Sequence, residues 1–216
     1  MWKEEHVFKI GNAKLYFLPV IKGLVSEEAK VSEGFNIAKP DCVCISISEE
    51  DLDIYQRIIT GSAEFENVPS TYDKIYIKNL SRFGTVKMPA PCFIKSIELA
   101  NQLKISVIPL DMNDETFTKA YCEYITYLQL VRYSMRAKKI AKREFKTDTA
   151  EEFVLLWDSL MTDLEGFRKL EELREETMSK NLIKLTEKYT RLLVIIELER
   201  FSGLLNKCGF KISVER

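Results

Sequence analysis

Histidine and cysteine are the side chains that most often bind transition metals, and this chain offers few of them. It contains one histidine, His6, and five cysteines, of which Cys42 and Cys44 form a Cys-x-Cys pair. A catalytic zinc site needs about three protein ligands and an open water position. The composition therefore excludes any mechanism that needs two histidine ligands from this chain. We interpret Cys42 and Cys44 as two buried thiols on one face of a strand, because residues two apart in a strand point the same way.

Oxygen ligands are concentrated in residues 111–115 (DMNDE). Such a run could bind Mg²⁺ or Ca²⁺, but it lacks the glycine, the spacing and the distal glutamate of an EF-hand. Acidic residues at the start of a helix also complement its dipole. We favour the helix cap and predict no metal and no cofactor.

A basic run covers residues 132–146, with Glu144 as its only acid. On a helix, Arg132, Arg136, Lys139 and Arg143 would form one stripe at spacings of three and four residues. This stripe could contact the phosphates of RNA or DNA, with an affinity that falls as salt rises. Few aromatic residues interleave with it, so base stacking is not indicated. A solvated or ion-paired helix face is the alternative, and we favour it.

The overall composition describes a globular chain of mixed charge. In 216 residues, 32 Lys and Arg balance 33 Asp and Glu, and 46% of the residues are hydrophobic. This balance argues against a globally basic nucleic-acid binder and against a disordered acidic chain. We see no signal peptide and no apolar run near the ~18 residues of a membrane span. Five cysteines in irregular spacing favour free thiols over a disulfide framework, so we expect a cytoplasmic protein without membrane contact.

The elements that would position these residues alternate between strand and helix. Apolar runs predict strands at 6–10, 14–18, 42–47, 105–110, 191–196 and 210–214. Helical spacing and capping residues predict helices at 26–39, 48–59, 72–83, 91–103 and 202–208. Residues 116–190 contain no proline and one glycine, and we expect them to be almost wholly helical.

Together these elements predict one compact α/β domain in three parts. Residues 1–115 form an N-terminal α/β part, 116–190 a long helical insertion that we call the helical arm, and 191–216 a strand–helix–strand unit that completes the domain. Buried strands separated by helices indicate a mainly parallel central sheet with flanking helices. In the helical arm, one helix with apolar residues from Tyr121 to Met135 should pair with another from Phe153 to Leu160 as a hairpin. Because two helices alone rarely form a core, we expect the arm to pack on the sheet or on another subunit, and we favour a homodimer through the arm.

Three blocks of sequence resemble the TraB/Tiki superfamily, which includes TraB, PrgY and GumN proteins and is related to erythromycin esterase-like proteins. The first block is residues 40–47 (PDCVCISI) with Arg57, and the second is residues 108–111 (IPLD) with Thr116 and Lys119. The third comprises residues 174–179 (REETMS) and 195–204 (IIELERFSGL). The blocks follow the family order over nearly the whole chain, and the resemblance implies a TraB-like α/β fold.

The departures from the family pattern fall on its proposed metal site. Where the family has Gly-x-x-His after the first strand, this chain has residues 18–22 (LPVIK), which end in Lys22. The glutamate after the second family strand is replaced by Ser46, and the closing Gly-x-Gly-His by residues 197–200 (ELER). A cation at Lys22 and at Arg200 would repel a divalent ion. The resemblance thus implies a hydrolase site that has been lost, and no catalytic residue is predicted.

The altered positions would still gather at one edge of the sheet. If the resemblance sets their placement, the cluster comprises Lys22, Ser46, Asp111, Glu197, Glu199 and Arg200. Open α/β sheets bind ligands beyond the carboxyl ends of their strands, so these residues are candidates for binding a small zwitterion or an anion. The alternative, which we favour, is an ion-pair network that keeps the site neutral. Arg57, Arg174 and Gly203 also match family positions, and we assign them structural roles in bracing helices against strand ends.

The sequence therefore predicts a TraB-like binding or regulatory homo-oligomer with a degenerate hydrolase site. One alternative is a metal-dependent hydrolase that uses the remaining carboxylates Asp111, Glu197 and Glu199. Another is a nucleic-acid-binding protein that uses the basic helix 132–146.

Overall fold

The computed structural model describes residues 6–63 and 69–210. Its strands are β1 (Val7–Ile10), β2 (Ala13–Val20), β3 (Cys42–Ile45), β4 (Ser106–Pro109) and β5 (Arg191–Glu197). Its first helices are α1 (Glu27–Ala38), α2 (Glu49–Ile59), α3 (Thr71–Leu80) and α4 (Pro91–Leu103). The later helices are α5 (Asp114–Tyr124), α6 (Tyr127–Ile140), α7 (Ala150–Met161), α8 (Glu165–Leu185) and α9 (Leu198–Lys207).

The strands form one mixed, mainly parallel sheet in the order β1-β2-β5-β3-β4. Strand β1 pairs antiparallel with β2, and the other neighbouring strands pair parallel. This confirms the predicted α/β class with a mainly parallel central sheet. Since four strands run the same way, their carboxyl ends meet at one edge, and β5, the last of the described strands in sequence, lies in the middle.

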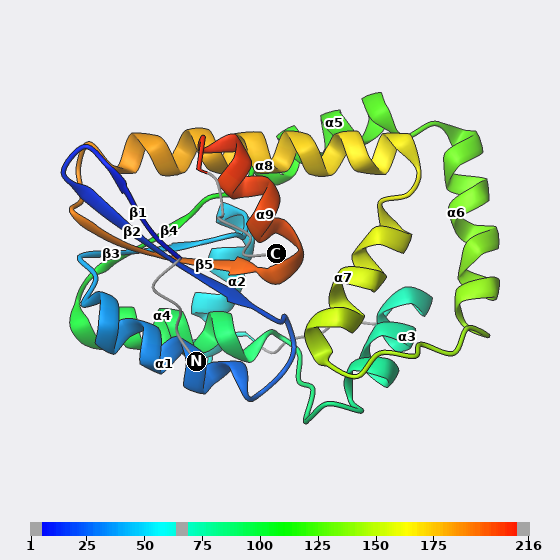
Figure 1. The fold of residues 1–216 in the computed structure, drawn as a ribbon, viewed down its shortest axis with the longest axis horizontal. Helices are drawn as coiled ribbons and strands as arrows, with labels where there is room; N and C mark the ends of the chain where they lie inside the picture. The colour runs from blue at the N-terminus through cyan, green and yellow to red at the C-terminus, as the bar shows by residue number, and fades with distance from the viewer. Residues whose placement is uncertain (1–5, 64–68, 211–216) are drawn as a thin grey trace.

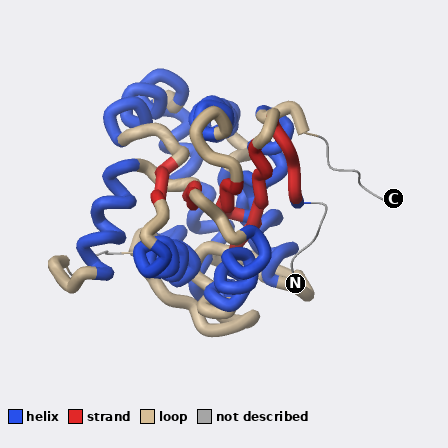
Figure 2. The backbone as a smooth tube through the Cα atoms, turned by 90° about the vertical axis from the view of Figure 1, so that its left-hand side faces the viewer, coloured by secondary structure: helices blue, strands red, loops and turns tan. Residues whose placement is uncertain are grey.

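Helices cover both faces of the sheet (Figures 1 and 2). Both faces are apolar because successive strand residues point to opposite sides of the sheet. On one face, α1 and α4 pack against Val43, Ile45, Leu193 and Ile195. On the other face Cys42, Cys44 and their neighbours in β5 pack against Met178 and Leu182 of α8 and Leu204 of α9. Both thiols are buried and free, as the spacing predicted.

A separate cluster of aromatic and aliphatic side chains joins α3 and α7 beyond the sheet. Phe153 and Val154 of α7 are buried with Leu80 of α3 and with Phe145 from the segment before α7. Tyr76 of α3 packs on the Phe153 and Trp157 rings, with centroids 5.7 and 5.6 Å away. In Figure 1, α6 lies at one end of the molecule, on the side of α7 that faces away from the sheet.

The helical arm differs from the prediction in two ways. The helix expected around Tyr121–Met135 is broken, because Ile125 is extended and Thr126 and Gln129 cap the next helix through reciprocal side-chain-to-backbone hydrogen bonds of 3.0 and 3.4 Å. The expected hairpin between that helix and residues 153–160 is also wrong. Tyr133 of α6 stacks instead on Phe167 of α8, 4.7 Å between centroids, and Leu128 is exposed.

Most other elements match the prediction to within a few residues. The exception is α9, which starts at Leu198, directly after β5, rather than at Ser202. Of the strand predicted at 210–214, Phe210 is not in a strand, and residues 211–214 lie outside the described residues. Within the described part of the chain, no helix combines the length and apolarity needed to cross a membrane.

Candidate functional site

The six sequence-predicted site residues lie at or soon after the carboxyl ends of parallel strands. Lys22 comes after β2, Ser46 directly follows β3, and Asp111 comes after β4. Glu197 is the last residue of β5, and Glu199 and Arg200 lie in the first turn of α9. Helix α9, which begins at this edge, packs against both α7 and α8.

Ser46 and Glu197 form the centre of the cluster. Both are buried, at 1% and 5% exposure, and the Ser46 hydroxyl donates a hydrogen bond to Glu197 Oε2. The Arg200 guanidinium lies on the same carboxylate oxygen, with Nε 3.9 Å from Oε2. Glu197 therefore has a hydroxyl donor and a cation beside it, which is the pairing that a buried carboxylate requires.

A chain of ion pairs continues from Arg200 to Asp111 through α8. Arg200 pairs with Glu171, and Arg174 lies 3.1 Å from the other oxygen of Glu171. Arg174 also donates from Nε to Asp111 Oδ2 over 2.9 Å. Burial lowers the pKa of Arg200, and Asp111 and Asp158 act in the opposite direction. The two ends of the predicted cluster are thus joined by side chains of α8.

Two members of the cluster, Arg200 and Glu199, each have a buried polar atom without a hydrogen-bond partner among the described residues, and the atom of Arg200 is Nε. The atom of Glu199 is Oε2. Burial raises the pKa of Glu199 to about 8, with a further contribution from the neighbouring charge of Glu197, while Lys22 opposes the shift. At pH 7 this carboxyl group is therefore mostly protonated, since a buried carboxylate next to another negative charge is disfavoured.

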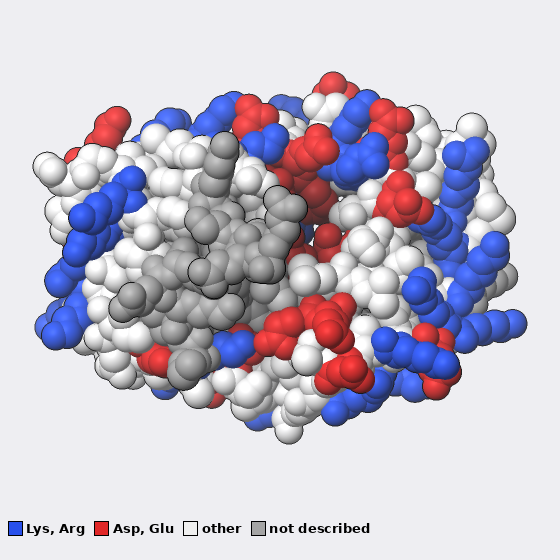
Figure 3. All heavy atoms as spheres, viewed as in Figure 1, with Lys and Arg blue, Asp and Glu red and all other residues white. Residues whose placement is uncertain are grey.

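Two further acids share the environment of Glu199. Burial raises the pKa of Asp158 on α7, against the effect of Arg200. Burial also raises the pKa of Glu175 on α8 to about 7, against Lys207 and with a contribution from Asp158. Figure 3 shows acidic side chains around a hollow in the middle of the molecule, between α9 and α7. The strand-end site is thus richer in carboxyl groups than the sequence indicated.

A third acid, Glu27 in the first turn of α1, reaches the same edge from the opposite face. It is 2% exposed, accepts a hydrogen bond of 3.3 Å from the Ile21 backbone N–H, and pairs with Lys30 at 2.7 Å. Burial raises the pKa of Cys92, and Glu197 and Glu27 raise it further. The Tyr76 hydroxyl donates to the Lys22 carbonyl over 3.3 Å.

The residues assigned structural roles differ in what they contact. Arg174 joins α8 to the segment after β4, as described, and Gly203 lets Glu175 lie against α9, because a side chain there would collide with the Glu175 carboxylate. Arg57 is exposed, and its ion pair is with Asp53 one turn earlier on α2, at 3.9 Å. That contact lies within one helix rather than between a helix and a strand.

The described residues of the site do not include a group of side chains arranged to bind a metal ion. Within residues 6–63 and 69–210, no three His, Cys, Asp or Glu side chains are grouped so that they could hold one ion. The single histidine packs its ring edge-on against Phe201, 4.8 Å between centroids. The run at 111–115 caps α5, where the Asn113 side chain accepts from the Thr116 N–H at 2.9 Å.

Sequence reasoning missed Glu171, Glu175 and Glu27. Glu171 and Arg174 stand three apart on a helix, a spacing that indicates a pair, but nothing in the sequence places them against Arg200. Comparison of the chain with protein-family models and with curated proteins finds no match. The site must therefore be interpreted from its own geometry.

Proposed function

We propose that this chain is a divergent TraB-like protein whose strand-end site binds a small ligand and has lost metal-dependent hydrolysis. The observation that carries the proposal is the network from Ser46 through Glu197 and Arg200 to Asp111. A buried cation at Arg200 holds Glu197, and Arg174 holds Asp111, so these carboxylates are already neutralised. A divalent ion would have to displace both guanidinium groups to use them as ligands.

A protonated amine is the ligand that the site favours. Glu199 keeps one carboxyl oxygen without a partner, and its pKa of about 8 means that it holds a proton at pH 7. A bound ammonium group would donate to that oxygen and stabilise the ionised form of Glu199. Binding should then release a proton from the protein.

Calorimetric titration tests this proposal, with spermidine and free arginine as probes at pH 7 in two buffers of different ionisation enthalpy. We expect binding with release of on the order of one proton. The Glu199→Gln variant should bind more weakly and release none, whereas Glu176→Gln, on the exposed side of α8, should behave as the unmodified chain. Absence of binding by both probes, or proton release that Glu199→Gln leaves unchanged, would contradict the amine assignment.

A second candidate is hydrolysis that uses the two carboxyl groups at the end of β5. Glu197 is hydrogen-bonded and next to Arg200, while burial keeps Glu199 protonated. Two carboxyls in such different environments are the usual pattern of a general base and a general acid. Ester or amide turnover that Glu199→Gln abolishes would favour this candidate. If Mn²⁺ or Zn²⁺ increased that turnover and a chelator stopped it, the metal-dependent alternative would be favoured.

We further propose that the protein is a cytoplasmic homodimer joined through α6. The outer face of α6 exposes Tyr127 at 78%, Leu128 at 67% and Met135 at 58%. A shallow pocket of about 340 Å³ lies among Tyr127, Val131 and Met135. Several large, exposed apolar side chains grouped on one helix face are typical of a surface that contacts another protein.

Nucleic-acid binding through α6 is a third candidate. Figure 3 shows Lys and Arg side chains along the edge of the molecule that α6 forms, and residues 127–143 include no Asp or Glu. Arg136 is already paired with Asp163, and Arg143 lies over the Phe145 ring at 5.6 Å. Retention on heparin that fades with salt and is lost in Arg132→Glu/Lys139→Glu would support it, and retention that this variant leaves unchanged would exclude it.

A further inference from the structure

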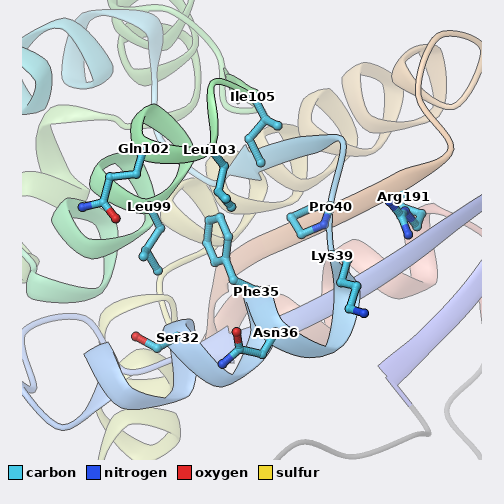
Figure 4. Close-up of a pocket in the computed structure, with 10 residues that line it drawn as sticks. All are labelled: Ser32, Phe35, Asn36, Lys39, Pro40, Leu99, Gln102, Leu103, Ile105 and Arg191. Carbon is cyan, nitrogen blue, oxygen red and sulfur yellow. The ribbon is translucent and has the colours of Figure 1, made fainter.

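A second pocket lies at the opposite end of the sheet from the candidate site. It has a volume of about 620 Å³ and opens between the C-terminal halves of α1 and α4 (Figure 4). Lys39 and Pro40 precede β3, Ile105 precedes β4, and Arg191 begins β5. The pocket is therefore at the amino ends of the strands, and it shares no residue with the charged network described above.

The middle of this pocket is apolar. Phe35 of α1 and Leu99 and Leu103 of α4 point toward one another across it (Figure 4). Leu103 is 57% exposed, which leaves a large aliphatic side chain facing solvent at the pocket wall. Pockets of roughly 300–1,000 Å³ with mainly apolar walls are typical of small-molecule sites.

Two cations stand together at one end of the apolar wall. In Figure 4 Lys39 and Arg191 lie on the far side of Pro40, and Ser32 and Gln102 lie at the other end. Within the described residues neither Lys39 nor Arg191 forms an ion pair. The pocket thus has a positive end and an apolar body.

The neighbouring acid, Asp41, is engaged elsewhere. Its carboxylate accepts hydrogen bonds from the Thr190 hydroxyl and backbone N–H, at 2.7 and 2.9 Å, and from the Arg191 N–H at 2.9 Å. These bonds lower the pKa of Asp41 against the effect of its partial burial. Asp41 therefore fixes the backbone at the start of β5, and with it the position of Arg191, instead of neutralising the guanidinium.

We infer that this pocket binds a small amphiphilic carboxylate, with its carboxylate at Lys39 and Arg191 and its apolar chain across Phe35 and Leu103. Charge complementarity selects an anion, and the apolar wall selects a ligand with a hydrocarbon body over a free inorganic anion. Ser32, Asn36 and Gln102 add neutral hydrogen-bonding groups at the wall but no charge. The inference concerns a different end of the sheet from the proposed function and does not depend on it.

Lys39 allows a matched pair of variants. It is the C-cap of α1 in the left-handed conformation, with φ of 42°, and Lys104 is the C-cap of α4 with φ of 55°. A cation at either position also complements its helix dipole, so a change at Lys39 alone would not separate the two roles. Asparagine tolerates the left-handed conformation without a charge. Lys39→Asn thus removes one positive charge from a helix C-cap that lines the pocket, and Lys104→Asn removes one from an equivalent C-cap that does not line it.

The experiment is displacement of the fluorescent probe 1-anilinonaphthalene-8-sulfonate by decanoate, with decanol and decylamine as uncharged and cationic analogues. We expect decanoate to displace the probe and the two analogues to do so at least ten times more weakly. Lys39→Asn/Arg191→Gln should weaken decanoate binding at least ten-fold, Leu103→Ser several-fold, and Lys104→Asn not at all. Circular dichroism of each variant checks that the fold is retained.

Two results would overturn the assignment. Equal displacement by decanoate and decanol, or equal decanoate affinity in the double variant and in Lys104→Asn, would show that the cations do not bind the ligand. Co-sedimentation with vesicles of anionic phosphatidylglycerol, lost in the double variant and without binding of free decanoate, would instead identify a lipid surface as the partner. Spermidine binding at the strand-end site is expected to be the same in all these variants.

Discussion

At the scale of single residues, Glu197 and Glu199 show how environment divides two chemically identical side chains. Glu197 receives the Ser46 hydroxyl and lies beside Arg200, whereas one oxygen of Glu199 is buried without a partner. Burial and the charge of Glu197 raise the pKa of Glu199 from an ordinary value of 4.5 to about 8. Glu199 thus stays protonated at neutral pH beside Glu197, which is held by Ser46 and Arg200.

This difference predicts a pH-dependent stability. Between pH 4.5 and about 8 the folded protein keeps the Glu199 proton and the unfolded chain loses it, so Glu199 makes the free energy of unfolding fall as pH rises. Glu199→Gln removes this cost. We expect its melting temperature to lie within about 3 °C of that of the unmodified chain at pH 5 and to exceed it by roughly 10 °C at pH 8.5.

Thermal unfolding followed by circular dichroism at pH 5, 7 and 8.5 measures this difference. The control is Glu165→Gln on α8, because the hydrogen bond and charge of Lys169 lower the pKa of Glu165 and its side chain is exposed. That variant should show no gain at pH 8.5. A melting-temperature difference for Glu199→Gln that does not change with pH would count against the raised pKa.

At the scale of elements, α8 and α9 meet where the Glu175 side chain lies against Gly203. A Cβ atom at Gly203 would collide with the carboxylate of Glu175, which is the end of a flexible side chain and can move aside. Because alanine also favours a helix over glycine by roughly 1 kcal/mol, we expect Gly203→Ala to change the free energy of unfolding by less than about 1 kcal/mol. With Glu175→Ala in the same chain the collision is absent, and Gly203→Ala should then raise the free energy of unfolding by about 1 kcal/mol.

Urea denaturation of the two single variants and the double variant measures the coupling between the two positions. Ser202→Ala, at the exposed neighbouring position of α9, should change stability by less than about 0.5 kcal/mol. If Glu175→Ala does not change the effect of Gly203→Ala, then the glycine matters for another reason than contact with α8.

The sequence predicts elements well where local chemistry decides them. The run at 42–45 is apolar at every position and forms β3, and Pro91 begins α4 as a proline in the first helical turn should. The break between α5 and α6 was missed, because Tyr121 to Met135 keep helical spacing across it. At the break, Gly166 of α8 lies against the Tyr124 carbonyl at the end of α5, a tertiary contact that the sequence does not indicate.

The candidate site was also predicted in part and missed in part from the sequence. Its position at strand ends follows from the parallel sheet, and Lys22, Ser46 and Glu197 were placed by the family resemblance. The ion-pair partners within the site come from Arg174 and Glu171 of α8, which lie 23 and 26 residues before Glu197 in the sequence. Glu171 and Glu27 are ordinary helix acids in the sequence, and only tertiary packing makes them part of the site.

At the scale of the whole molecule, α6 separates its apolar side chains from most of its cations. Tyr127, Leu128 and Met135 lie in the first nine residues, which carry only Arg132, and the other cations of residues 127–143 follow at 136–143. Two copies of α6 crossing antiparallel near Val131 would pair the apolar parts and direct the basic ends away from each other. The contact should therefore tolerate both low and high salt, unlike nucleic-acid binding.

Sedimentation velocity at micromolar concentration tests this arrangement in 0.05 and 0.5 M salt. We expect the mass of two chains in both, and the mass of one chain for Leu128→Glu, because the contact would have to bury a carboxylate without a partner. Leu155→Glu is the matched control, since Leu155 is also exposed, at 49%, but lies on α7. A dimer that persists in Leu128→Glu and dissociates in Leu155→Glu would indicate an interface on α7 instead of α6. A single-chain mass for the unmodified protein would contradict the dimer itself.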